Sequence, residues 1–181
     1  MRRCDMATGK KAHDDAPSFT GFTVRLFLYL FVVSLLFSVG NLHEGLLPMQ
    51  LLLANSATAG ANLFGAEASV EGTIIRTQHA ALDINHECTG IFVLLVYTMF
   101  VLAYPAPWRN RLSGAAVGWI TLNVVNAARL VLLTVIASGR PEWFAYFHEY
   151  FFQGLFIALL AVLASIWTEQ VRRATLPGVP A

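Results

Sequence analysis

Long apolar runs, separated by short polar stretches, dominate this chain. A helix needs about 20 apolar residues to cross the hydrocarbon core of a bilayer, within a range of roughly 17 to 25. Four runs meet that requirement: Leu26 to Leu42, Thr89 to Pro105, Leu112 to Ala137 and Tyr150 to Thr168. The pattern therefore predicts an all-α polytopic membrane protein with about four transmembrane helices.

A fifth apolar run, residues 46–64, is interrupted by groups that lipid does not accommodate. Polar groups in the hydrocarbon region must find partners within the protein. This run contains one proline and five polar residues: Pro48, Gln50, Asn55, Ser56, Thr58 and Asn62. We therefore expect it to form an interfacial or partly re-entrant helix that does not cross the membrane.

Strand character is confined to residues 66–87. The segments "GTIIR" and "AALDIN" flank the turn-like "TQH", which predicts a short extracytoplasmic β-hairpin. A lone hairpin is marginally stable, so it should pack on the interfacial helix or on the helix bundle. With no internal repeat, residues 22–170 are expected to form a single membrane-embedded domain between a disordered N-terminus, 1–21, and a tail, 171–181.

Composition supports a membrane protein, and the basic residues orient it. Apolar residues make up 56% of the chain and charged residues only 13%. Lys and Arg near the ends of spanning helices gather on the cytoplasmic side. Nine of the twelve lie in three places: Arg2, Arg3, Lys10, Lys11 and Arg25, then Arg109 and Arg111, then Arg172 and Arg173. These places share one side if four helices cross, so we expect an inner (plasma) membrane protein with both termini in the cytoplasm.

The two cysteines, Cys4 and Cys88, fall on opposite sides of the membrane in this topology and cannot pair. An unpaired thiol in an oxidising extracytoplasmic compartment is prone to oxidation. Cys88 is therefore either buried for packing or kept for its reactivity. It directly precedes the helix expected from Thr89, and a helix N-terminus lowers the pKa of a thiol, which favours reactivity.

A polar stripe runs along the third predicted span, where Asn123, Asn126 and Arg129 recur at i+3 steps. Burying an arginine in the membrane costs about 2.5 to 3.5 kcal/mol, and its charge cannot be shed. The stripe should therefore face the bundle. Alternatively, Arg129 snorkels to the headgroups while the asparagines join helices. Gly114 and Gly118 in "GAAVG" predict a close-packing face.

His148 precedes the last predicted span in "PEWFAYFHEYFFQGLF". A helix N-terminus there would favour the neutral imidazole, which can act as a base. The alternative is an interfacial histidine anchored among its aromatic neighbours. His86 also remains a candidate base because it lies two residues from Cys88, whereas Glu149 is not assigned a role.

Three separate segments thus bring a thiol, a guanidinium and an imidazole to one side of the membrane. A cysteine nucleophile needs a base within about 2.6 to 3.2 Å. Acyl transfer also needs positive charge where the carbonyl oxygen becomes anionic. Cys88, His148 and Arg129 supply one group of each kind.

The motifs "ECTGI" around Cys88, "NAAR" from Asn126 to Arg129 and "HEYFFQG" from His148 occur in this order, downstream of the hairpin. In these features residues 66–168 resemble the exosortase and archaeosortase family of membrane transpeptidases, and the chain is similar in size to the compact exosortase subtypes. The resemblance implies that Cys88 is the nucleophile, Arg129 the family's characteristic arginine, His148 the general acid/base and Asn126 a supporting residue. From the chemistry of the site we expect Arg129 to stabilise the oxyanion.

The same resemblance implies a thiol protease and transpeptidase active on the extracytoplasmic face. Its substrates would be exported proteins whose C-terminal sorting signal has a short motif, a transmembrane helix and a basic tail. Cleavage would pass through a Cys88 thioester, and the product would go to a surface acceptor or to water. Membrane lipids are expected partners, and nucleic acid, cofactor and metal are not expected.

Two other function classes remain open on sequence alone. A haem- or metal-binding subunit could use the histidines on the outer side, which are His43, His79, His86 and His148. None of them is paired with another inside a spanning helix, which argues against this class. A non-catalytic scaffold could use Arg129 to recognise a partner's carboxylate, and Cys88 would then be inert.

Overall fold

The computed structural model describes residues 19–39 and 45–175. Its elements are α1 (Phe19–Val39), α3 (Leu47–Leu63), β1 (Ser69–Glu71), β2 (Ile74–Arg76), β3 (Ala81–Asp83), the 3₁₀ turn η1 (His86–Thr89), α4 (Ile91–Ala103), α5 (Trp108–Gly139), the 3₁₀ turn η2 (Pro141–Trp143), α6 (Phe144–Tyr146), the π turn η3 (Phe147–Phe151) and α7 (Phe152–Thr175). Cys4, His43 and the predicted disordered stretch up to residue 18 lie outside the described residues. The helix α1 begins at Phe19, within the stretch 1–21 that was predicted to be disordered.

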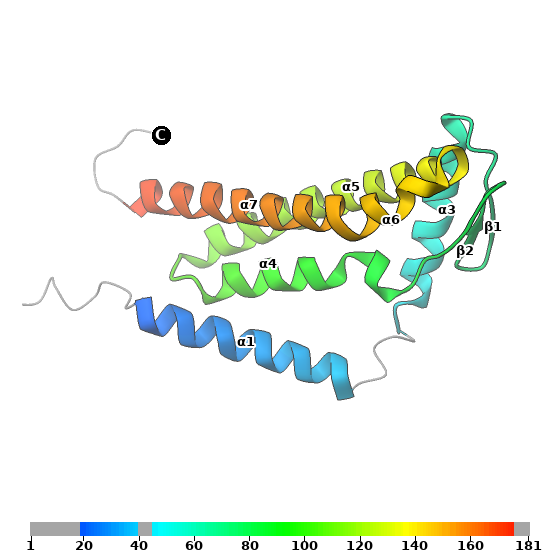
Figure 1. The fold of residues 1–181 in the computed structure, drawn as a ribbon. Coiled ribbons are helices and arrows are strands. Elements are labelled where there is room, and N and C mark those ends of the chain that lie inside the picture. Colours follow the sequence, from blue (N-terminus) through cyan, green and yellow to red (C-terminus); the bar gives the residue numbers. More distant parts are fainter. Residues whose placement is uncertain (1–18, 40–44, 176–181) are drawn as a thin grey trace, which may run out of the picture.

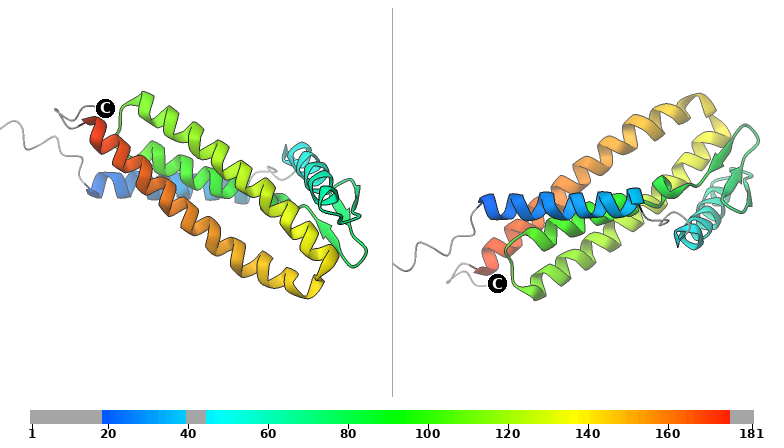
Figure 2. Two further views of the ribbon diagram at one scale, coloured as in Figure 1. Left: turned by 90° about the horizontal axis from the view of Figure 1, so that it is seen from above. Right: turned by 90° about the horizontal axis from the view of Figure 1, so that it is seen from below.

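The helices α1, α4, α5 and α7 lie lengthwise against one another as a bundle (Figures 1 and 2). In the described part of the chain, two continuous helices are long and apolar enough to cross a membrane, Trp108–Gly139 and Pro141–Ala174. Two shorter apolar helices, Phe19–Leu35 and Ile91–Ala103, complete the bundle. The bundle thus uses all four of the predicted runs.

The helix α4 is shorter than the predicted span Thr89–Pro105. It has 13 residues, a length of about 20 Å, which is less than the roughly 30 Å of a hydrocarbon core. Residues 86–89 form a separate 3₁₀ turn, and Gly90 breaks the helix with a φ of 70°. At the other end, Tyr104 is already extended before Pro105.

The helix α3 runs across one end of the bundle instead of along it (Figure 1). Its buried face consists of small side chains, namely Ala54, Ala57, Thr58 and Ala61, which lets it approach α5 closely. Asn55 and Ser56 donate hydrogen bonds to carbonyls of their own helix, at 2.7 Å in each case. Residues 46–64 thus form a helix that lies across the bundle, which is the orientation expected of an interfacial helix.

Beside α3 lies an antiparallel sheet with the order β1-β2-β3. The predicted hairpin is present as the β2–β3 pair, in which Ile75 lies opposite Leu82. The prediction of a two-stranded hairpin was incomplete, because β1 has only three residues and carries little pattern. The carboxamide of Asn62 on α3 holds Ala68, donating to its carbonyl at 2.9 Å and accepting from its amide at 2.7 Å.

The two ends of the bundle differ in character (Figure 1). The start of α1, the connection from α4 to α5 and the end of α7 lie together at one end, which we call the basic end. Its arginines among the described residues are Arg25, Arg109, Arg111, Arg172 and Arg173. The sheet and α3 lie at the other end, which we call the sheet end. The three basic places therefore share one end, as the charge pattern predicted.

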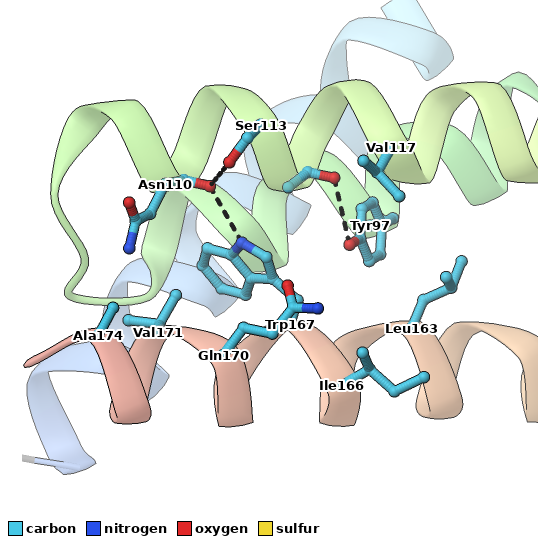
Figure 3. Close-up of a pocket in the computed structure, with 11 residues that line it drawn as sticks. Tyr97, Asn110, Ser113, Val117, Leu163, Ile166, Trp167, Gln170, Val171 and Ala174 are labelled. Atoms are coloured by element: carbon cyan, nitrogen blue, oxygen red, sulfur yellow. Dashed lines mark hydrogen bonds between the residues drawn. The ribbon is translucent and has the colours of Figure 1, made fainter. Parts of the chain in front are cut away.

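Close packing near the basic end depends on two glycines of α5 (Figure 3). A Cβ on Gly114 would lie 2.1 Å from Nε1 of Trp167, and one on Gly118 would lie 1.9 Å from Cε1 of Tyr97. The indole of Trp167 donates to the Asn110 carbonyl at 3.0 Å. The packing face predicted from "GAAVG" is therefore confirmed.

Candidate active site

Cys88 lies in the 3₁₀ turn that connects the sheet to α4. The Oδ1 atom of Asn85 accepts hydrogen bonds from the amides of Glu87 at 3.0 Å and Cys88 at 3.2 Å. The hydroxyl of Thr89 donates to the His86 carbonyl at 2.6 Å. Cys88 was expected to stand at the N-terminus of a spanning helix, but its turn is separated from α4 by Gly90.

Asn126 connects this turn to α5. It is 2% exposed, and its Nδ2 donates to the Cys88 carbonyl at 2.9 Å. A Cβ on Gly90 would lie 3.2 Å from Cγ of Asn126, so the glycine leaves room for this carboxamide. Asn123, one turn earlier, instead donates to the Trp119 carbonyl of its own helix at 2.8 Å. Only one of the two asparagines therefore bridges elements.

Arg129 points from α5 toward α7. Its Cζ lies 5.8 Å from the centroid of the Phe152 ring and 5.7 Å from that of Phe156. Both rings are buried, so the guanidinium lies inside the bundle and not among headgroups as the snorkelling alternative requires. Its Nε is buried without a hydrogen-bond partner, and no carboxylate pairs with it among residues 19–39 and 45–175. Aromatic faces are its main neighbours, which leaves its charge for a ligand.

His148 lies in the π turn between α6 and α7. Its ring stacks on that of Phe144 with centroids 5.4 Å apart and planes 16° apart. The continuous helix that contains His148 begins at Pro141, so the expectation that His148 stands at a helix N-terminus is wrong. The positive end of a helix dipole acts only within the first turn, and His148 lies beyond it.

The π turn changes which residues share a face with His148. In a regular α-helix, a residue five positions away is rotated by about 140°. In a π turn the hydrogen bonds run from i to i+5, so residues five apart lie above one another. Gln153 is five residues after His148, and both side chains line the same cavity.

That cavity, which we call the Cys88 cavity, has a volume of about 830 Å³. It brings together Cys88 from η1, Arg129 from α5 and His148 from the π turn. His86 and Glu87 line it as well. The remaining lining residues come from α1, the start of α4 and α7: Ser34, Gly90, Ile91, Phe92, Val93, Val96, Gln153, Phe156, Ile157 and Leu160.

Burial determines the state of the thiol. Cys88 is 8% exposed, and this burial raises the pKa of its thiol above the ordinary value. The charge of Arg129 and the backbone N–H of Asn85 oppose that change, whereas Glu87 and Asp83 add to it. The predicted lowering of the Cys88 pKa by a helix dipole is therefore wrong. The resting thiol is neutral and needs a base before it can react.

The three histidines in the described part of the chain divide between two places. His86 and His148 line the Cys88 cavity, whereas His79 is exposed in the connection between β2 and β3. In the part of the chain that the structure describes, no three His, Cys, Asp or Glu side chains are grouped so that they could hold a metal ion.

A second hollow, of about 350 Å³, lies between α5 and α7 at the basic end (Figure 3). Tyr97, Trp167, Asn110 and Gln170 line it together with small and aliphatic side chains, and no thiol, imidazole or charged side chain does. The groups predicted to carry chemistry therefore all belong to the Cys88 cavity.

A protein-family model described as a transmembrane exosortase (Exosortase_EpsH) matches residues 16–172. This chain belongs to the transmembrane exosortase family. The match covers "ECTGI", "NAAR" and "HEYFFQG", and it confirms the resemblance inferred from those motifs. No curated protein and no solved structure gives a significant match.

Sequence reasoning missed several residues of this exosortase's cavity. Gln153 belongs to "HEYFFQG", but the sequence alone did not show that it lines the same cavity as His148. Glu87 is adjacent to Cys88 in the chain, and its place in the cavity lining could have been suspected from that position alone. Ser34 comes from a helix that carried no chemical signal, and only the packing of α1 reveals it.

Proposed function

We propose that this exosortase is a membrane cysteine transpeptidase that cleaves the C-terminal sorting signal of exported proteins. The observation that carries the proposal is the meeting of Cys88, Arg129 and His148 in one cavity, from three separate elements. A thiol, a fixed cation and an imidazole around one space supply the nucleophile, the oxyanion stabiliser and the acid/base that acyl transfer needs.

In the first half-reaction, His148 accepts the proton of the neutral thiol as the sulfur attacks the substrate carbonyl carbon. The carbonyl oxygen becomes negative, and Arg129 stabilises it by charge and hydrogen bonding. The C–N bond then breaks, and the imidazolium gives its proton to the departing amine. The N-terminal part of the substrate remains bound to Cys88 as a thioester.

In the second half-reaction, an acceptor nucleophile attacks the thioester and His148 removes its proton. An amine or hydroxyl on a surface component would yield a transferred protein, whereas water would yield simple cleavage. The thiolate leaves and takes the proton back from His148, which restores the starting state.

Two polar side chains hold Cys88 for this chemistry without touching the reacting atoms. Asn85 accepts from its amide, and Asn126 donates to its carbonyl. His86 remains a second candidate for the base, since it lines the same cavity. Rates of the His86→Gln and His148→Gln variants would separate the two, because only the true base is needed for thiol activation.

The proposal includes an orientation. The sheet end faces the extracytoplasmic side, where exported substrates arrive, and both chain ends remain in the cytoplasm. The charge pattern supports this, since the described arginines outside the cavity and the sheet gather largely at the basic end.

Replacing Cys88 with alanine tests the nucleophile. Processing should slow by at least about a thousandfold, as for other covalent catalysts that lose their nucleophile. Immunoblots should show uncut substrate accumulating while the variant remains in the membrane fraction. Cys4→Ala is the matched control and should process normally. Processing at the wild-type rate by Cys88→Ala, together with a loss of function in Arg129→Met, would instead favour the scaffold alternative.

A further inference from the structure

The helix α1 is attached to the bundle mainly near the basic end. The Phe22 ring meets those of Phe100 and Tyr104 on α4, with centroid distances of 5.7 and 5.8 Å. Tyr104 in turn meets Trp167 of α7 at 5.4 Å. This aromatic cluster fixes the first turns of α1 against the rest of the protein.

Toward the sheet end, α1 diverges from α4 (Figure 1). It packs along α4, but within the described residues its contact with α7 is at most marginal. The Cys88 cavity fills the resulting space, with Ser34 of α1 on one wall and Ile157 of α7 on another. Because α1 and α7 hardly touch, we infer that the cavity is bounded by protein on the α4 side and opens sideways between α1 and α7.

The walls of the cavity change character along its length. Its charged and polar groups gather around the Cys88 turn, and they include Arg129 and His148. Farther along α4 and α7 the lining becomes apolar, with Val93, Val96, Phe156, Ile157 and Leu160. Val96 is five residues after Ile91, the first residue of α4, so the lining extends along that helix for about 8 Å at a helical rise.

Side chains at the open edge lack protein partners. Ile157 is 71% exposed and Phe92 is 62% exposed, although both line the cavity. An apolar groove open to lipid on one side and continuous with polar reactive groups at one end has the chemistry of a site for a chain that is apolar over most of its length.

We propose that the apolar helix of the sorting signal docks in this lateral groove, which is formed by Ser34, Val93, Val96, Ile157 and Leu160. This inference rests on the proposed function, because it assumes that Cys88 acts on a membrane-anchored substrate. The substrate helix enters sideways from the bilayer, and the peptide just before it reaches Cys88. A lipid acyl chain would suit the apolar walls but would present no peptide bond at the polar end.

Photocrosslinking tests the groove directly. In the Cys88→Ala protein, benzoylphenylalanine at position 157 should crosslink to a substrate that carries the complete sorting signal. Position 120 on α5 is the matched control, since Ile120 is 67% exposed but does not line the cavity. No crosslink to this substrate should form at position 120. Equal crosslinking at both positions, or crosslinking of position 157 only to labelled phospholipid, would overturn the proposal.

A kinetic test separates docking from chemistry. Leu160→Trp fills the apolar part of the groove, so it should raise KM for a helix-bearing substrate by a larger factor than KM for a soluble motif peptide. Equal losses with both substrates, or no effect on either, would overturn the docking site. If Cys88→Ala still cleaves while position 157 crosslinks, the proposed function fails and the binding groove stands. If cleavage needs Cys88 but the groove tests fail, only the docking site is wrong.

Discussion

At the scale of single residues, Cys88 is positioned by its backbone. Asn85 accepts from its amide, and Asn126 donates to its carbonyl, so the thiol itself forms no part of the support. This arrangement separates the residue that would react from those that hold it. Substitutions at the two asparagines should therefore change the geometry of the turn before they change its chemistry.

Asn126→Ala removes the donor to the Cys88 carbonyl, and an unpaired buried carbonyl costs about 1 to 3 kcal/mol. A displaced turn would misplace the Cys88 sulfur, which should lower kcat by up to about a hundredfold. KM should change little, because the apolar groove lies away from the displaced turn. Asn123→Ala is the matched control, because its carboxamide bonds only to its own helix. Steady-state kinetics on both variants would decide, and a similar kcat for the two would contradict a positioning role.

The ionisation of Cys88 can be followed by alkylation. Burial raises the pKa of the thiol, so its reaction with iodoacetamide should accelerate only as pH rises above the ordinary thiol range. Arg129 opposes that change, so Arg129→Met should move the midpoint to still higher pH, with about a tenfold loss of thiolate at fixed pH for each full pKa unit. Arg109→Met, exposed at the basic end, should leave the midpoint unchanged. A midpoint below that of the unfolded protein would contradict the burial argument.

At this scale the sequence singled out the groups that the structure brings into one cavity, but not their states. Arg129 stood out because a charge inside a spanning helix must be compensated, and Cys88 because it was an unpaired thiol beside a helix. The direction of its pKa could not be predicted, since burial is a property of the packed cavity and outweighs a dipole that the break at Gly90 disconnects. Gln153 could not be placed without the π turn.

At the scale of elements, the helices combine different lengths. Asn126, which meets the Cys88 turn, lies 13 residues before the end of α5 at Gly139, or about 20 Å along that helix. Toward the sheet end, α4 therefore stops well short of α5. The turn that contains Cys88 occupies the space beyond the first residue of α4.

The close packing of α5 against its neighbours can be tested at its glycines. Gly118→Ala would force a methyl group against the fully buried ring of Tyr97 and should destabilise the protein by about 1 to 3 kcal/mol. Gly154→Ala on α7 is the control, because a Cβ there meets nothing within 4 Å. It should be neutral or stabilise by up to about 1 kcal/mol. Thermal unfolding in detergent would measure both, and equal midpoints would contradict the packing argument.

Apolar periodicity located every long helix, and turn chemistry located the β2–β3 pair. Neither signal found β1 or the ends of α4, and the start of α4 depends on a glycine in the left-handed region. The π turn is also invisible in the sequence, because an extra residue in one turn leaves composition and mean periodicity unchanged.

At the scale of the whole molecule, the start of α1 and the end of α7 share one end of the bundle and the sheet occupies the other (Figure 1). Charge alone predicted this division, because it requires only that an even number of helices separate the basic places. The divergence of α1 from α4 could not be predicted, because it depends on which helix surfaces are complementary in shape and not on the apolar content of each helix.

The orientation can be tested by cysteine labelling in intact cells, in a Cys4→Ser, Cys88→Ala background. His79→Cys in the sheet should react with a membrane-impermeant maleimide from outside. Trp108→Cys at the basic end should react only after permeabilisation, although Trp108 is 61% exposed. Labelling of both sites, or of neither, in intact cells would contradict opposite placement across the membrane.

The shortness of α4 also bears on how long an acylated enzyme would last. A helix about 10 Å shorter than the hydrocarbon core leaves its reactive turn in a recess below the tops of the longer helices. On the proposed function, a cleaved fragment that still occupies this recess would keep both water and the acceptor away from a thioester at Cys88. The lifetime of the acylated enzyme would then depend on how fast that fragment leaves as well as on the intrinsic speed of hydrolysis.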